Sequence, residues 1–358
     1  GWAGLRCRMR ERTAWIMGGI AAALPVVGLL IWLNLDGGGS AIEIPLLPAS
    51  PSEPSHPRLK VLEEPGKWEL VKTAQSTTAT NHNTGTLHAY WGLNGHCLIL
   101  EAEMTDHTGA ITYELSVKHF NDQIDHYHYT LIQDDGYVRG LIGKWKTQST
   151  RMDWWSVYLP GAPGGVSQRM VEQQLTPSER KTSIDIVNNN QVELSVSIES
   201  KRAGGPEAAP TAQPATPELA RLGTAGVWQE VEAVMEEGKL ITYRINGRSR
   251  WTRGGRALIY EGVIDNNGEG VYFMWVKTYD RMDGIYRFVY FFKDGPVDHF
   301  VGKWDEATKT IVWRSIQPPG NRVIHETFTS PTHRTWRVEF FDNERKLVSS
   351  SDGESRLK

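Results

Sequence analysis

Three histidines lie close together in the first half of the chain, and histidine is a common metal ligand. On a β-strand His126 and His128 would project from one face because they are two residues apart, and His119 precedes them. A zinc site needs several protein ligands, so a further one would have to come from elsewhere in the chain. Histidines on a solvated strand explain the same residues, and we predict no metal site.

Two pairs of residues combine an aromatic ring with a hydroxyl at strand spacing. Trp154 with Ser156, and Trp313 with Ser315, would share a face of a strand because alternate residues point the same way. Aromatic walls with a few polar groups are typical of small-molecule pockets, whereas similar side chains also fill the interior of a small barrel. We name these four residues as candidates to bind a ligand, although the side-chain-filled interior of a small barrel favours core filling.

Histidines and glutamates of predicted strands are the remaining candidates for chemistry. His299 and His325 stand among aromatic or apolar residues and could hold a ligand or transfer a proton. Glu101 and Glu261 occupy matching places in two similar segments, but one carboxylate per segment provides no acid–base pair. The chain has no phosphate-binding loop, nucleophile elbow, HExxH motif or dinucleotide fingerprint. We therefore predict ligand binding through His299 and His325, no catalytic residues, and a cofactor that stays unknown.

The composition limits the kinds of protein that the chain can be. Its 358 residues are 39% hydrophobic and 23% charged, which suits packed domains and excludes a multispanning membrane protein. The net charge of -3 offers no basic field, so no nucleic-acid partner is expected. Cys7 and Cys97 lie on opposite sides of the most apolar segment, and we expect no disulfide between them.

One apolar segment is long enough to cross a membrane. Residues 14–33 carry no charge and would extend about 30 Å as a helix, with Trp15 and Trp32 near its ends. Arginines precede the segment, so the positive-inside rule keeps residues 1–12 in the cytoplasm. We predict a transmembrane helix at residues 13–35, a single-pass anchor in the cytoplasmic (inner) membrane, and extracytoplasmic or periplasmic domains. A cleaved signal peptide is the alternative, although its apolar region is usually shorter.

Two stretches rich in glycine, proline, serine and alanine divide the rest of the chain. Residues 36–60 are predicted to be a stalk and residues 202–224 a linker, because such composition buries no core. They separate two domains, expected at residues 61–201 and 225–350. Residues 351–358 are polar and are expected to be a tail.

The two domains are copies of one unit. Trp68 matches Trp228 at an offset of 160 residues, and Trp145 matches Trp304 at an offset of 159. Matches continue through lysine, tyrosine, Asp-Gly and serine positions, and Pro177 meets a second proline after a difference in loop length. Self-similarity at a fixed offset indicates a repeated structural unit.

Each repeat has the pattern of short β-strands. Runs of β-branched and aromatic residues recur along it, and an Asp-Gly pair at the same place in both repeats indicates a turn. We predict an all-β fold with about eight to ten antiparallel strands per repeat, closed into a barrel because closure removes exposed edges. Short helical exceptions are expected at residues 217–222 and near residues 168–174.

Lys277-Thr-Tyr-Asp280, Gly302-Lys-Trp304 and the run that ends at Trp313 form a pattern in the second repeat. This pattern resembles the lipocalin-like bacterial family called domain of unknown function 1579, and the first repeat resembles it more faintly. The resemblance implies two tandem lipocalin-like antiparallel β-barrels and no established activity. The related nitrobindins bind haem, but both repeats lack their Gly-x-Trp-x-Gly-x-Gly opening.

The resemblance also implies a structural role for four tryptophans. In lipocalin-type barrels the tryptophan of the opening Gly-x-Trp closes the barrel floor, and Trp68 and Trp228 stand in that motif. We predict that Trp145 and Trp304, which lie in a second Gly-x-Trp of each repeat, close the barrels as well.

These observations predict a bacterial membrane-anchored protein with two lipocalin-like barrels outside the cytoplasmic membrane. The leading hypothesis is a non-enzymatic binding or sensing protein that takes a small apolar ligand through the open end of a barrel. The alternative is an interaction or regulatory domain with filled barrels, the extracytoplasmic end of a membrane regulator whose protein partner is unknown. An envelope enzyme is the second alternative.

Overall fold

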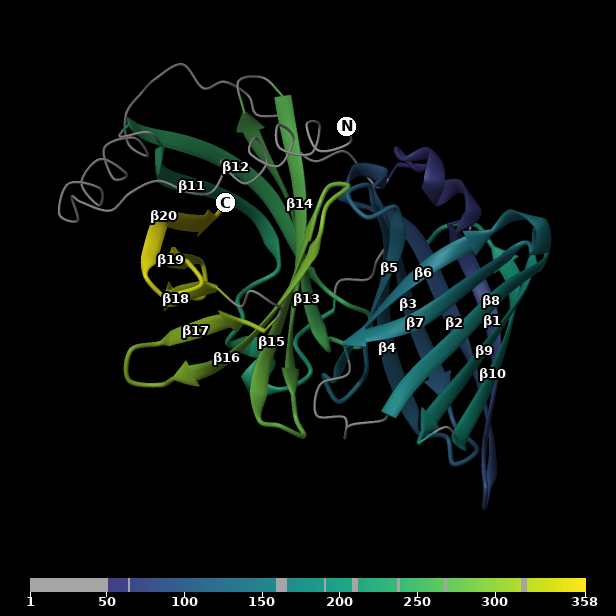
Figure 1. Ribbon diagram of the computed structural model, residues 1–358. Helices are drawn as coiled ribbons and strands as arrows, with labels where there is room; N and C mark the ends of the chain where they lie inside the picture. Colours follow the sequence, from purple (N-terminus) through teal and green to yellow (C-terminus); the bar gives the residue numbers. More distant parts are fainter. Residues whose placement is uncertain are drawn as a thin grey trace.

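The computed structural model describes residues 51–358 apart from residues 64, 159–165, 190, 208–211, 237–238, 267–268 and 317–320. The predicted transmembrane helix at residues 13–35 lies outside this part of the chain. Among the described residues, no helix is long and apolar enough to cross a bilayer. These residues form two closed β-barrels that stand side by side (Figure 1).

The first barrel is a meander of ten antiparallel strands in which β1 closes the sheet by pairing with β10. Its strands are β1 (Gly66–Ser76), β2 (Thr80–Gly92), β3 (Cys97–Thr105), β4 (Ile111–Asn121), β5 (His126–Ile132), β6 (Val138–Lys146), β7 (Arg151–Tyr158), β8 (Val166–Thr176), β9 (Glu179–Asn188) and β10 (Gln191–Gly204). Two 3-10 turns, η3 (Leu93–Gly95) and η4 (Thr147–Ser149), connect strands. The helical turn expected near residues 168–174 is wrong, because these residues belong to β8, whose alternate side chains face the interior.

The second barrel repeats this meander, and β11 pairs with β20. Its strands are β11 (Gly226–Glu236), β12 (Lys239–Trp251), β13 (Ala257–Asn266), β14 (Glu269–Asp280), β15 (Ile285–Phe292), β16 (Val297–Asp305), β17 (Thr310–Ser315), β18 (Arg322–Ser330), β19 (His333–Phe341) and β20 (Leu347–Leu357). The predicted all-β barrels with eight to ten strands each are therefore confirmed.

The polar tail predicted at residues 351–358 is wrong, because these residues continue β20 almost to the end of the chain. Their small side chains suit the interior of the barrel. A Cβ atom at Gly353 would lie 2.1 Å from the indole of Trp336, and Ser355 donates a hydrogen bond to Glu230. Because β20 passes beside large side chains, its own inward residues are small or polar, and its sequence therefore resembles a polar tail.

A short helix closes one end of each barrel. Tyr127 of the first barrel donates a hydrogen bond of 2.7 Å to the carbonyl of Arg58, in the 3-10 helix η2 (Pro57–Val61). At the same place in the second barrel, Tyr286 donates one of 3.1 Å to the carbonyl of Glu218, in α3 (Pro217–Ala220). We call this end of each barrel the plug end and the opposite end the mouth.

The plug helices correct two predicted boundaries. Leu59 of η2 and Leu219 of α3 are buried in the cores of their barrels. The predicted stalk at residues 36–60 therefore ends in a structured segment, and the predicted linker at residues 202–224 contains one, as the helix expected at residues 217–222 indicated. Prolines surround these two leucines in the sequence, so the overall composition of the stalk and linker does not reveal that each contains a buried residue.

The two barrels bury an apolar interface between them. One hydrophobic cluster contains residues of both barrels at matching places in the repeat. The matched pairs are Cys97 and Ala257, Ile99 and Ile259, Leu115 and Met274, Val117 and Val276, Ile132 and Phe291, and Val138 and Val297. The same surface of each repeat thus packs on its own copy, as in a two-fold symmetric dimer.

Backbone hydrogen bonds across the interface are reciprocal. The amide of Asp122 donates to the carbonyl of Asp294 over 3.2 Å, and the amide of Arg281 donates to the carbonyl of Asp135 over 2.8 Å. Both bonds join a turn at the plug end of one barrel to a turn at the mouth of the other. The barrels therefore lie antiparallel, and their mouths lie at opposite ends of the molecule.

A substitution at Gly136 tests how much this interface contributes to the stability of the protein. Gly136 has φ +87°, and a Cβ atom there would lie 2.0 Å from the carbonyl oxygen of Tyr279 in the other barrel. Gly109 has φ +85° with no atom within 4 Å of such a Cβ, so Gly109→Ala adds backbone strain alone. We expect Gly136→Ala to lower the free energy of unfolding by about 1–3 kcal/mol more than Gly109→Ala does in urea titrations. Equal losses would contradict the close packing of the barrels.

Candidate functional site

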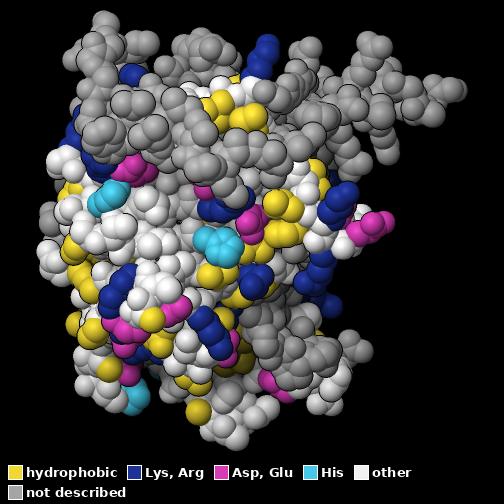
Figure 2. All heavy atoms as spheres, turned by 90° about the vertical axis from the view of Figure 1, so that its left-hand side faces the viewer, with side chains coloured by type: hydrophobic (Ala, Val, Ile, Leu, Met, Phe, Trp, Pro, Cys, Tyr) yellow, Lys and Arg dark blue, Asp and Glu magenta, His cyan; other side chains and the backbone are white. Residues whose placement is uncertain are grey.

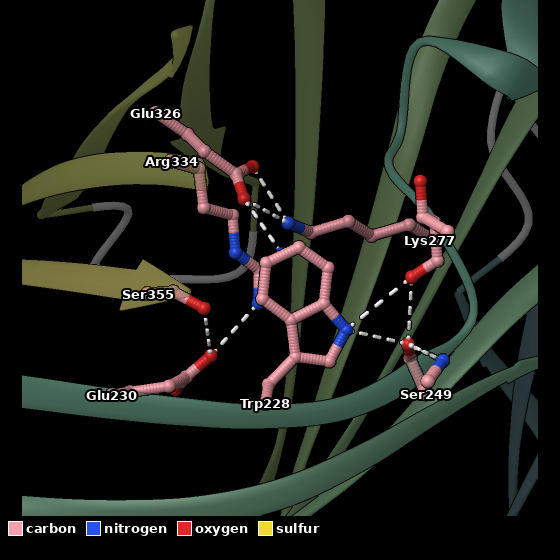
Figure 3. Close-up of polar contacts among 9 residues, drawn as sticks. Trp228, Glu230, Ser249, Lys277, Glu326, Arg334 and Ser355 are labelled. Atoms are coloured by element: carbon pink, nitrogen blue, oxygen red, sulfur yellow. Dashed lines mark hydrogen bonds and ion pairs between the residues drawn. The ribbon is translucent and has the colours of Figure 1, made fainter. Parts of the chain in front are cut away.

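A buried ion network lies inside the second barrel next to its plug end (Figure 3). We call this layer of side chains the floor of the barrel. The ammonium of Lys277 on β14 donates to both carboxylate oxygens of Glu326 on β18, over 2.7 and 2.6 Å. The guanidinium of Arg334 donates to Glu326 over 3.1 Å, and the indole N–H of Trp313 does so over 2.9 Å. One carboxylate thus accepts from two cations and a tryptophan.

A second carboxylate completes the balance of charge on the floor. Arg334 also donates to Glu230 of β11 over 2.9 Å, and the hydroxyl of Ser355 donates to Glu230 over 2.9 Å (Figure 3). Two cations therefore meet two anions, and all four side chains are nearly inaccessible to solvent. Buried charges are tolerable when each is paired and hydrogen-bonded, as here.

Aromatic rings surround these charges. The Lys277 ammonium lies 4.4 Å from the ring centre of Trp275, and the Arg334 guanidinium lies 5.0 Å from that of Trp228. Burial lowers the pKa of Lys277 to about 8, against the opposing charge of Glu326. Burial alone would raise the pKa of Glu326, but Lys277 and Arg334 hold it below its usual value. Both partners of the Lys277–Glu326 pair are therefore charged at neutral pH.

The first barrel carries a related network at matching positions. Lys118 donates to Glu63 over 2.6 Å and to Glu172 over 2.7 Å, and the indole of Trp154 donates to Glu172 over 3.0 Å. Arg180 stands where Arg334 stands in the second barrel, but it donates to the carbonyl of Leu62 beside the plug helix. The lysine, glutamate, arginine and tryptophan of the floor are thus present twice.

The acidic residues and the arginines of this network are not among the residues predicted from the sequence. Lys118 and Lys277 match at an offset of 159, whereas Glu172 with Glu326 and Arg180 with Arg334 match at 154. The alignment of Pro177 with Pro331 sets that second offset and could have revealed them. The signal was weak because charged strand residues are usually solvated.

The four tryptophans predicted to close the barrels lie at the plug ends. Trp68 and Trp228 are almost fully buried, and the Trp228 indole donates to Ser249 over 2.8 Å (Figure 3). Trp145 and Trp304 are partly exposed and pack against the cores of their barrels.

The structure separates the six residues predicted to bind a ligand. Trp154 and Trp313 belong to the floors of the two barrels, and Ser156 and Ser315 lie one inward position closer to the mouths, partly exposed. The remaining two residues face away from the interior of the second barrel. His299 is buried on the outer side of β16, and His325 lies on the outer surface, 3.4 Å from Glu339.

Two of the three clustered histidines meet at the interface between the barrels. The rings of His119 and His128 lie 5.1 Å apart, and His119 shares a hydrogen bond of 2.8 Å with the carbonyl of Gly295 in the second barrel. His126 instead contacts the exposed Trp155. The charge of His299, on the outer side of β16, is among the causes that lower the pKa of His128.

Another group of potential ligands lies beside the first plug helix. One ligand atom each from His56, Asp122 and Asp294 lies within 4.8 Å of the others. The Nδ1 atom of His56 accepts a hydrogen bond from the amide of Arg58, so its proton is on Nε2, which lies 3.2 Å from Asp122. The Nδ1 atom is therefore engaged with the backbone, and the protonated Nε2 faces the carboxylate at ion-pair distance, so neither nitrogen offers a free lone pair to a metal ion.

The mouth of the second barrel is lined by aromatic side chains. Phe273 stacks on Tyr290 at 5.4 Å between ring centres, and Tyr290 contacts Phe292 at 4.5 Å. Strand register places all three on the inner face, in line with Trp275 of the floor. Tyr290 and Phe292 are partly exposed, whereas the rings of the floor are buried.

Polar bonds cross the corresponding part of the first barrel. Lys72 on β1 forms an ion pair of 3.1 Å with Glu114 on β4, where the second barrel has Phe273. Arg139 donates to Gln133 over 2.7 Å and to Gln168 over 3.1 Å. The two mouths therefore differ in chemistry although the floors are alike.

Comparison with known proteins gives a limited result. No protein-family profile matches the chain, so the resemblance to domain of unknown function 1579 stays a prediction. No curated protein matches it either. Among solved structures it is similar to an S-type phycobiliprotein lyase from Guillardia theta, at 8% identity and a TM-score of 0.32 over 41% of this chain and 90% of that one.

Two further structures cover both barrels. A protein of unknown function from the DUF3598 family of Nostoc punctiforme has 11% identity and a TM-score of 0.24, over 82% of this chain and 96% of that one. Transferrin binding protein B from Haemophilus parasuis has 9% identity and a TM-score of 0.20, over 83% and 77%. Likenesses at this level carry no inference about what this chain binds.

Removal of Glu326 tests the floor network. Glu326→Leu leaves the charges of Lys277 and Arg334 buried without their shared partner, so we expect a loss of about 3–5 kcal/mol in unfolding free energy. Adding Lys277→Met should restore part of that loss, because it removes one unpaired charge. Glu306→Leu, which breaks an exposed ion pair with Lys309, is the matched control and should have a small effect. A loss at Glu326 no larger than at Glu306 would contradict the network.

Acidification tests the histidines at the interface. Burial first, and then the charges of His119 and His299, lower the pKa of His128 to about 3, whereas an unfolded histidine titrates near 6.5. Between these values the unfolded chain binds the extra proton, so this residue makes stability fall as the pH falls. His128→Leu should flatten unfolding free energy against pH by about 1.4 kcal/mol per pH unit in this window, and the exposed-site variant His107→Leu should not. Identical slopes would show that His128 is solvated.

Proposed function

We propose that this protein is a non-enzymatic binding protein and that a small apolar ligand enters the mouth of its second barrel. The observation that carries the proposal is the contrast along the interior of that barrel. Aromatic side chains at the mouth, Tyr290 and Phe292, remain partly exposed above a floor whose rings are buried. Apolar walls that solvent can reach, above a closed base, are typical of small-molecule sites.

The floor itself is better suited to structure than to chemistry. Its cations and carboxylates saturate one another, so none is left with a free charge to present to a substrate. The same lysine, glutamate and tryptophan recur in the first barrel, where the mouth above them is polar. A shared floor below two different mouths supports a role in closing the barrels.

The candidates for an enzyme active site do not converge. The carboxylate of Glu101 accepts from Arg250 over 2.7 Å and from the amide of Arg253 over 2.7 Å, across the interface between barrels. Glu261 accepts from the amide of Leu93 across the same interface. These contacts support a role for both glutamates in joining the barrels, which favours binding over catalysis.

The outer surface offers an apolar ligand little area. On the face of the molecule in Figure 2, acidic and basic side chains are interspersed and apolar side chains form small separate groups. The large exposed apolar residues include Leu240, Met282 and Val348, which come from different elements. Scattered single residues are normal on a protein surface, so the barrel interior is the better site for an apolar ligand.

The proposal keeps the location expected from the sequence. The apolar segment at residues 13–35, with arginines before it, supports a single-pass anchor that holds the barrels outside the cytoplasmic membrane. A barrel on such an anchor would meet ligands in the extracytoplasmic space.

Substitutions at one matched position test the proposal. Tyr290 in the second barrel and Leu131 in the first occupy the same inward place in their repeats. In saturation-transfer NMR of the intact chain with small water-soluble aromatic and aliphatic alcohols, we expect Tyr290→Ala to reduce the signal several-fold and Leu131→Ala to leave it unchanged. Equal signals from both variants, or none from the unsubstituted protein across the set, would contradict the proposed site.

A further inference from the structure

One carboxylate near the mouth of the second barrel lies in no ion pair with the residues that the structure describes. Glu232 lies on β11 two residues after Glu230, so it faces the interior like that floor residue. Among the described residues no lysine, arginine or histidine nitrogen lies within ion-pair distance of it, and it accepts one hydrogen bond of 2.7 Å, from Ser351. Burial raises the pKa of Glu232, as expected for a carboxyl group that protein atoms shield from water.

The arginine that acts on Glu232 electrostatically is already engaged. Arg322 acts on Glu232 electrostatically, but its guanidinium forms an ion pair of 2.8 Å with Asp298 and lies over the rings of Phe300 and Phe340. Because the floor charges balance one another, Glu232 leaves the described interior of the second barrel with an excess of one negative charge. An unpaired carboxylate in a shielded place is costly unless something compensates it.

The repeat shows what compensation looks like at this position. The residue of the first barrel that matches Glu232 is Lys72, and the residue that matches Phe273 is Glu114. Lys72 and Glu114 form an ion pair within the chain. In the second barrel Glu232 occupies the position of Lys72, and Phe273 occupies that of Glu114. A carboxylate and an aromatic ring therefore replace the ion pair of the first barrel.

The rings around Glu232 suit a cation as well as the carboxylate does. Phe273 occupies the position of Glu114, which lies 3.1 Å from Lys72 in the first barrel, so the repeat places this ring across the interior from Glu232. Burial, and then the charge of Glu232, raise the pKa of Tyr290. Phe273 stacks on Tyr290, and Phe292 contacts it. A cation is attracted to the face of an aromatic ring, and quaternary ammonium groups are commonly held in sites of this composition.

We propose that the ligand of the second barrel is a small organic cation, an amine or quaternary ammonium compound, whose charge is met by Glu232 and whose apolar part contacts Tyr290 and Phe292. This inference rests on the proposed function and specifies its ligand class.

Choline and its uncharged isostere 3,3-dimethylbutan-1-ol test the inference, because the two differ in charge and hardly in shape. Isothermal titration of the intact chain should show choline binding at least about tenfold more tightly than the alcohol. Glu232→Gln keeps an acceptor for Ser351 and removes the charge, so it should weaken choline by about tenfold and leave the alcohol unchanged. Glu114→Gln, which removes the carboxylate from the mouth of the first barrel, is the control and should change neither.

The outcomes separate this inference from the proposed function. If both compounds bind equally and Glu232→Gln affects neither, the inference fails while a binding site at Tyr290 stands. If choline binding depends on Glu114 and not on Glu232, the charge acts in the other barrel and the inference fails. If neither compound binds, the inference fails, and the alcohols tested against Tyr290→Ala decide the proposed function separately.

Discussion

Glu326 must stay ionised inside the second barrel, because Lys277 and Arg334 both donate to its carboxylate and neither cation reaches solvent. The surrounding rings pack against these cations and lose that support if the charges are unbalanced. Glu172 has the same place in the first barrel, where Lys118 and Trp154 donate to it. A balanced buried charge cluster is therefore the constraint on which each barrel floor depends, and it leaves the mouths free to differ.

The interface between the two barrels allows their mouths to differ in sequence. Matching apolar residues pack on one another, and reciprocal bonds from Asp122 and Arg281 join the plug end of each barrel to the mouth of the other. The mouths then lie at opposite ends, so a change inside one does not disturb the other. The ion pair of Lys72 and Glu114 in the first barrel, and the rings beside Glu232 in the second, are two results of this freedom.

The repeated strands could be predicted because they depend on local patterns. Offsets between tryptophans revealed the duplication, and alternating residues revealed the strands. β20 was missed because its Gly353 and Ser355 are small in order to fit beside Trp336 and Glu230, a requirement set by distant residues. The plug helices were missed in part because prolines and small residues surround their buried leucines.

The candidate site was less predictable than the fold. Trp154 and Trp313 were predicted to bind a ligand together with Ser156 and Ser315. Their hydrogen-bond partners, Glu172 and Glu326, lie on other strands, and only folding of the sheet brings them together. His299 and His325 have strand neighbours that suggest burial in a site, yet the register turns both of them outward. Which face of a strand points inward is decided by pairing with neighbours, and a single sequence carries little information about that.

The number of ligands bound per chain tests the central claim most directly, because two similar barrels with different mouths should not bind alike. Native mass spectrometry of the intact protein, purified gently from bacterial cells, measures that number. The account predicts one small-molecule adduct per chain, held in the second barrel. Two equivalent adducts per chain, or a bare chain mass that no added amine or apolar compound changes, would contradict it.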